Sequence, residues 1–399
     1  GESCIRTDNS KELRTSLSAI QHMETPRWLR IVCNWAVLIV VMFAGVVISF
    51  LQFVVTLCSP FLPKKTRIGL CQELANTWWL LFPFVIQVYA NIPVVWYGDQ
   101  LKGECSLTIC NHRTTLDFSI AALIATHAES VGCGRLVPLM KRVLRFVPGL
   151  GWICYFSGAL FLRRNWQKDR AALQAKVEEM ATYYPRPFWL ALYPEGTRFT
   201  EKKMLEAQEF AKKRNETRPK DKQLPIVRHC LLPRPKGFIC FAQDKRLRGA
   251  MDALNDFTVG VIGGDMRLTA FIKGSKFTTR ALHIHLHKTK FKDLPMENEA
   301  LEKMLYTSFQ KKDARLAHLE AHGRYPPEDE PITPAYAPRK SKLTAAFAMW
   351  AVVYLCTMAT LFIWQVVVAN ALVLALVTGY SVRNSIDKDG RAPSTETKT

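Results

Sequence analysis

Leu107–Ser119 reads LTICNHRTTLDFS, and both the fold and the chemistry of this chain depend on it. Its first four residues form a short β-prone run, which the polar cluster after Cys110 brings to an end. His112 and Asp117 are five positions apart, so on one regular helix their side chains would diverge by about 140°. They meet only if His112 lies on the turn before a helix and Asp117 lies in its first turn.

Two interpretations of this cluster are open. In the first, His112 is a general base whose imidazole is oriented by Asp117. In the second, Thr114-x-x-Asp117 is a capping-box-like pattern that simply starts a helix. The second interpretation accounts for Asp117 but gives His112 no role.

Two further apolar runs end in charged and flexible residues. Gly158–Arg164 (GALFLRR) closes with two arginines, of which at most one faces a site, because neighbours on an extended chain point opposite ways. Leu192–Phe199 (LYPEGTRF) closes with an acid, a glycine and an arginine, although a plain surface turn has the same signature. Sheets of α/β proteins bind ligands at the carboxyl ends of their strands, and the planar fork of arginine suits a phosphate there.

Strand-length apolar runs alternate with helical stretches in the centre of the chain. The expected strands are 107–110, 159–162, 188–193, 257–262 and 282–286, and helical spacing occurs in 170–183, 205–213 and 298–318. This alternation predicts an α/β fold with a mostly parallel sheet flanked by helices.

Long uncharged blocks flank this centre. Ile31–Pro60 and Thr344–Val382 both exceed the roughly 20 residues that cross a hydrocarbon core, the second as one tilted helix or as two passes. Trp78–Tyr97 is interrupted by Pro and polar residues and has aromatic ends. We expect it to be the second arm of a membrane helical hairpin, with a buried soluble helix as the alternative.

These features predict five parts. They are a tail with membrane-embedded helices (1–100), a catalytic domain (101–325), a proline-rich linker (326–343), a C-terminal transmembrane region (344–382) and a polar tail (383–399). The net charge of +20 favours nucleic acid or an anionic membrane as partner, and the apolar blocks favour the membrane. Eleven cysteines without a CxxC pair indicate a reducing compartment for the soluble part.

The sequence gives little support for a metal site, a serine-hydrolase site or a nucleotide-binding loop. His283, His285 and His287 alternate along a strand without a cysteine or carboxylate at ligand spacing, so we expect a solvated or core-edge face and no metal. No GxSxG and no GxxxxGK[ST] occurs, which disfavours the common serine hydrolases and nucleotide-binding proteins.

Together, the three clusters resemble the motifs of the glycerophospholipid acyltransferase family. Within it they look most like the 1-acyl-sn-glycerol-3-phosphate (lysophosphatidic acid) acyltransferases of the eukaryotic endoplasmic reticulum type. NHxxxxD matches Asn111, His112 and Asp117; GxxFLxR matches Gly158, Phe161, Leu162 and Arg164; EGTR matches Glu195–Arg198. The fourth motif is expected in Phe257–Gly264, where its proline is absent. The likeness extends through Leu231–Phe238 (LLPRPKGF) and covers roughly residues 25 to 380.

The resemblance implies a mechanism and a set of site residues. His112 would take the proton of the sn-2 hydroxyl of lysophosphatidic acid as that oxygen attacks the acyl-CoA thioester, with Asp117 fixing the imidazole tautomer. Arg164 and Arg198 are expected to bind the phosphate, and Glu195 to orient Arg198 or glycerol hydroxyls. The other expected binding residues are Gly158, Phe161, Gly196, Thr197 and Lys141, the last of which a solvated helix face would also explain. Backbone N–H groups near Gly158 or Gly196 are the candidate oxyanion donors.

The resemblance further implies acyl-CoA as co-substrate, no cofactor, a bilayer as partner and no nucleic acid. It implies a multi-pass protein of the endoplasmic reticulum membrane with a cytosolic catalytic domain. The alternatives are an acyltransferase for another lysophospholipid or for glycerol 3-phosphate, and a non-catalytic basic membrane-binding protein. Acyl-chain preference and oligomeric state stay open.

Overall fold

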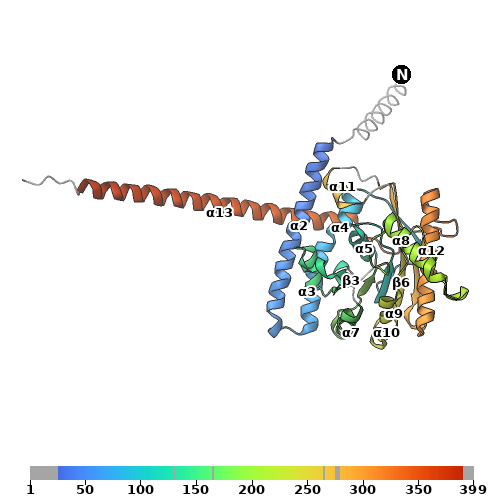
Figure 1. Cartoon of the computed structure of the whole chain (residues 1–399). Coiled ribbons are helices and arrows are strands. Elements are labelled where there is room, and N and C mark those ends of the chain that lie inside the picture. Colours follow the sequence, from blue (N-terminus) through green and yellow to red (C-terminus); the bar gives the residue numbers. More distant parts are fainter. Residues whose placement is uncertain (1–25, 129–131, 164–165, 264–265, 275–278, 390–399) are drawn as a thin grey trace, which may run out of the picture. The chain divides into compact units, whose positions relative to one another are not determined.

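The computed structural model describes residues 26–128, 132–163, 166–263, 266–274 and 279–389, and the chain divides after Phe347 into two compact units. The first unit is built on an eight-stranded sheet of order β4-β3-β5-β2-β6-β7-β1-β8 (Figure 1). The strands are β1 (Val94–Gly98), β2 (Ser106–Cys110), β3 (Leu136–Lys141), β4 (Leu160–Leu162), β5 (Trp189–Leu192), β6 (Ala253–Ile262), β7 (Ala281–Lys290) and β8 (Pro331–Ile332). Among the described residues only β6–β7 and β1–β8 pair antiparallel, so the prediction of a mostly parallel sheet is confirmed.

Helices cover both faces of this sheet. The α-helices of the first unit are α2 (Arg27–Leu57), α3 (Lys64–Trp79), α4 (Leu81–Phe84), α5 (Asp117–Thr126), α6 (Leu150–Phe156), α7 (Trp166–Tyr183), α8 (Glu201–Asn215), α9 (Pro235–Gln243), α10 (Lys245–Ala250), α11 (Leu268–Ile272) and α12 (Asn298–His322) within the described residues. Helix α13 (Lys340–Asp389) begins in the first unit and forms the described part of the second. The five expected strands and three expected helices all appear. Strands β1, β3 and β8 were not expected. Each lies in a segment that contains a proline or is too short to show the apolar pattern of a strand.

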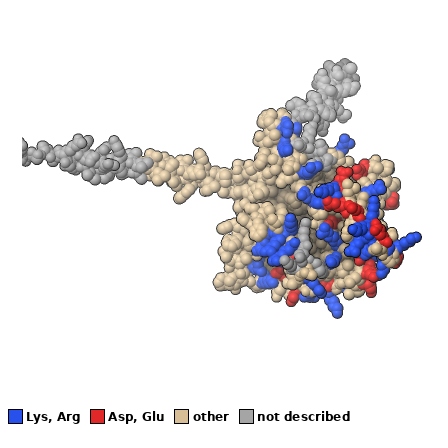
Figure 2. Space-filling model, viewed as in Figure 1, with Lys and Arg blue, Asp and Glu red and all other residues tan. Residues whose placement is uncertain are grey.

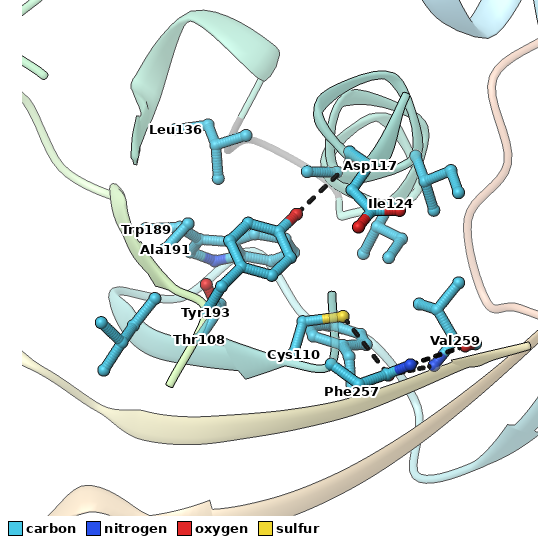
Figure 3. A pocket seen from close by; sticks show the side chains of 14 residues that line it. Thr108, Cys110, Asp117, Ile124, Leu136, Trp189, Ala191, Tyr193, Phe257 and Val259 are labelled. Carbon is cyan, nitrogen blue, oxygen red and sulfur yellow. Dashed lines mark hydrogen bonds between the residues drawn. The ribbon is translucent and has the colours of Figure 1, made fainter. Parts of the chain in front are cut away.

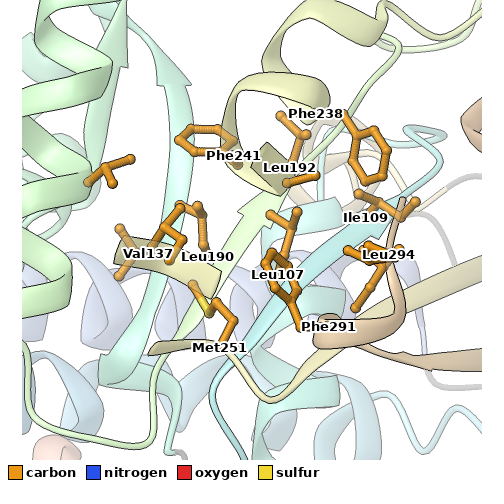
Figure 4. Packing of buried hydrophobic residues seen from close by; sticks show 14 of the residues in the cluster. Leu107, Ile109, Val137, Leu190, Leu192, Phe238, Phe241, Met251, Phe291 and Leu294 are labelled. Carbon is orange, nitrogen blue, oxygen red and sulfur yellow. The ribbon is translucent and has the colours of Figure 1, made fainter. Parts of the chain in front are cut away.

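The alternation of side chains along β2 separates the two faces. Leu107 and Ile109 enter a core with Phe238 and Phe241 of α9, which α7, α10 and α12 complete (Figure 4). Thr108 and Cys110 point to the opposite face, beneath α5. Both faces are buried, as a parallel sheet requires, because each is covered by helices.

The N-terminal hairpin exists, but its second arm differs from the prediction. The arm that follows α2 is α3, which begins at Lys64. Trp78–Tyr97 is not one helix: it contains the end of α3, then α4, a π-helical turn (Val85–Tyr89) and strand β1. Asn91 has φ +47° and Pro93 lacks an N–H, so the helical stretch stops there and the chain enters the sheet.

Hydrogen bonds hold the proline-rich linker, which belongs to the first unit, to the sheet and to residues beside it. Tyr325 Oη donates to the carbonyls of Thr258 (3.2 Å) and His283 (3.1 Å), and β8 pairs with β1. Gln100 binds the backbone of Thr333 and Ala335. Helix α13 then begins at Lys340 and is continuous, so Thr344–Val382 forms one helix and not two passes.

Candidate active site

The three motifs meet at one edge of the sheet. Strands β4, β3, β5 and β2 are parallel neighbours, so their carboxyl ends lie side by side. His112 follows β2, Lys141 ends β3, Arg163 follows β4 and Glu195 follows β5 closely. This is the edge at which open α/β sheets bind ligands.

His112 and Asp117 form a hydrogen-bonded pair. Nδ1 of His112 and Oδ2 of Asp117 are 2.5 Å apart, which confirms the predicted geometry. The other carboxylate oxygen, Oδ1, accepts from the backbone N–H and the hydroxyl of Thr114, both at 3.0 Å. Helix α5 starts at Asp117. One oxygen of its carboxylate therefore binds Thr114 before the start of the helix, and the other binds His112. The capping and catalytic interpretations are therefore compatible.

The imidazole keeps one nitrogen open. Because a carboxylate oxygen accepts, Nδ1 donates this hydrogen bond and Nε2 has the lone pair. Nε2 makes no hydrogen bond within the described residues, and the side chain is 25% exposed, against 7% for Asp117. The Tyr193 ring lies 4.7 Å from the imidazole, and its hydroxyl donates to the Asp117 carbonyl (Figure 3).

The backbone of His112 is held by the third motif. Its N–H donates to Oε1 of Glu195 (2.9 Å), and its carbonyl accepts from the N–H of Phe199 (2.8 Å). The preceding Asn111 side chain exchanges two hydrogen bonds with the backbone of Val259 on β6. These contacts fix the turn that carries the His112 imidazole.

Glu195 lies beneath His112 and not toward a substrate. It is only 2% exposed, and burial raises the pKa of its carboxyl group to about 8. Its Oε1 accepts from the His112 N–H, a contact that was not expected, and no hydrogen bond joins its side chain to Arg198 within the described residues. Oε2 is buried and has no hydrogen-bond partner within the described residues.

The two motif glycines have structural roles. Gly196 has φ +69°, and its N–H donates to the Tyr193 carbonyl (2.9 Å). Gly158 has φ +91°, a Cβ there would lie 1.8 Å from the Tyr184 hydroxyl, and its N–H donates to the Tyr155 carbonyl. Neither N–H is therefore free to stabilise an oxyanion.

The basic residues expected at the site lie in the segments at the ends of different strands. Arg198 is exposed, and its side chain has no hydrogen bond or ion pair within the described part of the chain; Thr197 accepts from Lys203 Nζ (2.6 Å). Lys141 is exposed at the end of strand β3, which excludes the alternative of a helix face. Arg164 lies outside the described residues. Phe161 lines a hollow of about 540 Å³ whose other lining residues are Arg142, Arg145, Arg163, Asp169 and Ala172.

A second support for the site was not predicted. Arg113 Nη1 donates to the His229 carbonyl (2.7 Å), and its guanidinium lies over the Phe199 ring. Asp313 of α12 in turn accepts from the backbone N–H groups of Arg228, His229 and Cys230. These residues are distant in sequence and no motif unites them, so only the folded chain reveals the connection.

The cavity beside Asp117 is small. It is bounded by Tyr193, Cys110, Ile124 and Val259, among others, and has a volume of about 30 Å³ (Figure 3). This space holds one or two water molecules and not an acyl chain.

Comparisons with known proteins agree with the motifs. The Acyltransferase family model matches residues 91–228, and the model for the Acyltransferase C-terminus matches residues 272–350. A solved structure, the 1-acyl-sn-glycerophosphate acyltransferase of Thermotoga maritima, covers 73% of this chain and 99% of its own at 16% identity, with a TM-score of 0.37. The sequence relatives, and not this loose structural match, decide the family.

Three relatives illustrate the sequence match. The 1-acyl-sn-glycerol-3-phosphate acyltransferase 2 of Brassica oleracea is 32% identical over 293 residues, covering 72% of this chain and 71% of its own. Its Arabidopsis thaliana namesake is 31% identical over 72% of both chains. The human gamma enzyme is 27% identical over 78% of this chain and 79% of its own. The chain belongs to the 1-acyl-sn-glycerol-3-phosphate acyltransferase family, as the three motifs predicted.

Proposed function

We propose that this protein transfers the acyl group of acyl-CoA to the sn-2 hydroxyl of lysophosphatidic acid, which gives phosphatidic acid. The observation that carries the proposal is the His112–Asp117 pair, whose Nε2 is open at the carboxyl edge of the sheet. The relatives of this chain carry the name of the acceptor, 1-acyl-sn-glycerol-3-phosphate, in their own names. No cofactor is required, because the hydroxyl is the nucleophile and the thioester is already activated.

In the proposed reaction, Nε2 of His112 removes the hydroxyl proton as the oxygen attacks the thioester carbonyl. The tetrahedral intermediate then expels the CoA thiolate, which takes the proton from the imidazolium, so an ester and free CoA are formed. Asp117 stabilises the imidazolium through Nδ1. General base catalysis of this kind contributes on the order of 10² to 10⁴ in rate.

The oxyanion donors are assigned to the turn after Gly196. The N–H groups of Thr197 and Arg198 form no hydrogen bond within the described residues, whereas that of Gly196 does. Thr197 and Arg198 come shortly after Glu195, whose side chain accepts from the His112 N–H, so their own N–H groups lie near the reacting atoms. Backbone donors of this kind are suited to the charge of a tetrahedral intermediate.

Phosphate recognition is assigned to arginine and lysine at the strand ends. Arg198 and Lys141 are exposed, and the hollow beside Phe161 carries Arg142, Arg145 and Arg163. Arg164, in the same motif, is included in the proposal from the sequence. A phosphomonoester carries close to two negative charges at neutral pH and would be held by such groups.

Membrane docking by α2 is proposed from its exposed stripe. Large apolar side chains are exposed along its length at intervals of three or four residues; they are Trp28, Val32, Trp35, Ile39, Met42, Val46, Phe50, Phe53 and Leu57. In Figure 2 the part formed by α2 is largely uncharged, and Lys, Arg, Asp and Glu gather over the rest of the first unit. Such a one-sided apolar helix is suited to lipid contact.

The opposite side of α2 is packed on protein. Asn34 Nδ2 donates to the Phe271 carbonyl (2.6 Å), Gln52 Nε2 to the Cys71 carbonyl (2.8 Å), and Trp78 Nε1 to the Val41 carbonyl (2.9 Å). We therefore propose that the α2–α3 hairpin dips into one leaflet. Helix α13, whose portion Lys340–Val373 holds an apolar window of 18 residues without a buried member, is proposed to span the endoplasmic reticulum membrane, with the first unit in the cytosol.

An acceptor panel tests the reaction. Membranes containing the full chain are supplied with one labelled acyl-CoA and, separately, lysophosphatidic acid, lysophosphatidylcholine, lysophosphatidylethanolamine and glycerol 3-phosphate. We expect the highest kcat/KM for lysophosphatidic acid. A higher value for another acceptor would assign the enzyme to that lipid, and no transfer to any acceptor would favour the non-catalytic alternative.

Labelling of Cys58, an exposed residue directly after α2, tests the hairpin. A membrane-impermeant maleimide is applied to sealed microsomes before and after permeabilisation, with Cys58→Ala as the control for the assigned peptide. A hairpin within one leaflet predicts that permeabilisation does not increase labelling. Labelling that appears only after permeabilisation would show that α2 crosses to the lumen.

A further inference from the structure

Arg234 lies beside the third motif although no motif contains it. Its backbone N–H donates to the Pro194 carbonyl (2.8 Å), next to Glu195. Pro235 opens α9 immediately afterwards, and a following proline keeps Arg234 in the extended conformation observed, with φ −99° and ψ 108°. The Cα of Arg234 is thereby fixed against the turn.

The side chain of Arg234 runs along Gly196. A Cβ added to Gly196 would lie 3.5 Å from Cδ, 3.6 Å from Nε and 3.7 Å from Cζ of Arg234. The guanidinium group is therefore within van der Waals reach of the turn that also carries Thr197 and Arg198. Glu195, on the other side of Gly196, binds the backbone of His112.

The charge of Arg234 is not compensated by the protein. Arg234 and Arg198 are both exposed, and neither side chain has a hydrogen bond or ion pair within the described residues. Arg113, the other arginine of this region, donates to the His229 carbonyl instead. The neighbouring carboxylate of Glu195 is buried beneath His112 and does not pair with them.

We propose that Arg234 binds a phosphate group of a substrate at the third motif. Two unpaired guanidinium groups beside one turn favour an anion, and their planar forks match phosphate oxygens. This inference rests on the proposed function, which offers two sources of phosphate: the phosphomonoester of the lysolipid acceptor and the phosphates of CoA. Arg234 supplies binding and touches no reacting bond.

Steady-state kinetics of full-length Arg234→Gln in membranes test the proposal. The KM for lysophosphatidic acid is measured at saturating acyl-CoA, and the KM for acyl-CoA at saturating lysophosphatidic acid. Loss of charged hydrogen bonds should raise one KM by about tenfold or more, with kcat within about threefold of wild type. A rise for lysophosphatidic acid assigns the acceptor phosphate, and a rise for acyl-CoA assigns the donor. Arg234→Lys should recover part of the affinity.

Arg228→Gln is the matched control, because Arg228 is exposed in the same segment and its side chain makes no contact of this kind. Both KM values of this variant should equal those of wild type. Equal KM values in Arg234→Gln and Arg228→Gln, with an active wild-type enzyme, would overturn the inference and leave the proposed function standing. An inactive wild-type enzyme would instead contradict the proposed function.

Discussion

Two histidine–aspartate pairs of the first unit differ in their properties. In the first, His112 and Asp117 are 2.5 Å apart, and the imidazole is 25% exposed. In the second, Nε2 of His285 on β7 lies 3.1 Å from Oδ1 of Asp329, and the imidazole is 6% exposed. Arg315 also donates to Asp329, at 2.7 and 3.3 Å. Burial and the charge of Arg315 lower the pKa of His285 to about 4.

The difference agrees with the catalytic role that we propose for the first pair. Asp117 has no competing cation among the described residues, and Nε2 of His112 stays open. In the second pair Arg315 shares the carboxylate, and the imidazole is enclosed between the sheet and the linker. His283 is likewise buried and binds the Tyr97 hydroxyl (2.8 Å), whereas His287 is exposed. The expected solvated or core-edge face therefore fits the HIHLH run: His283 and His285 belong to the edge of the core, and His287 is solvated.

The largest expected effect is the loss of activity in His112→Ala. Removal of the general base should lower kcat for transfer from labelled acyl-CoA by about 10² to 10⁴. His285→Gln should keep activity per folded enzyme close to wild type, because its imidazole does not reach the site. Similar losses in the two variants would contradict the distinction between the pairs.

The next effect is on stability. Asp329→Ala leaves Arg315 and His285 without their shared carboxylate, and breaking such a buried pair should lower the free energy of unfolding by about 2–4 kcal/mol. Thermal unfolding in detergent measures this change. We expect kcat at a temperature where the variant is folded to stay near wild type. A large kcat loss with an unchanged unfolding temperature would give Asp329 a catalytic role.

A smaller effect is expected when the support of His112 is removed. Glu195→Ala deletes the acceptor of the His112 N–H, which costs about 1–3 kcal/mol and should lower kcat roughly 10- to 100-fold. Glu195→Gln retains a carbonyl oxygen at that position and should keep most of the activity. If the glutamine variant is as impaired as the alanine variant, the acceptor for the His112 N–H is not what Glu195 contributes to activity.

The smallest effect is on the pH dependence of stability, and its sign differs between the two regions. The pKa of His285 is lowered to about 4, so the unfolded chain binds more protons below pH 6.5 and stability falls as the pH drops from about 6.5 to 4. The pKa of Glu195 is raised to about 8, so the folded chain holds the extra proton and stability falls as the pH rises from about 4.5 to 8.

Unfolding temperatures across this pH range separate the two contributions. His285→Gln should reduce the loss of stability on the acid side, and Glu195→Gln should reduce the loss toward pH 8. An unchanged pH profile in either variant would show that the residue titrates alike in the folded and unfolded chains.

Local sequence was sufficient for much of the site. The strand before His112, the turn that returns Asp117 to it, and the strand ends that Arg163 and Glu195 follow all depend on neighbouring residues, and the structure shows each of them. The continuous apolar blocks likewise predicted long helices, because length and lack of charge are read directly from the chain.

Contacts between distant segments were decided only by the tertiary structure. Three such contacts involve residues separated by tens to two hundred positions in the sequence. Glu195 binds the backbone of His112, Asp313 supports Arg113 through the backbone of His229, and Arg234 lies beside Gly196. Whether a histidine beside an aspartate is open or enclosed also depends on which helix and strand cover it. Periodicity fixes which face a side chain takes, whereas strand order and register determine its partners, and these arise only when the whole sheet is assembled.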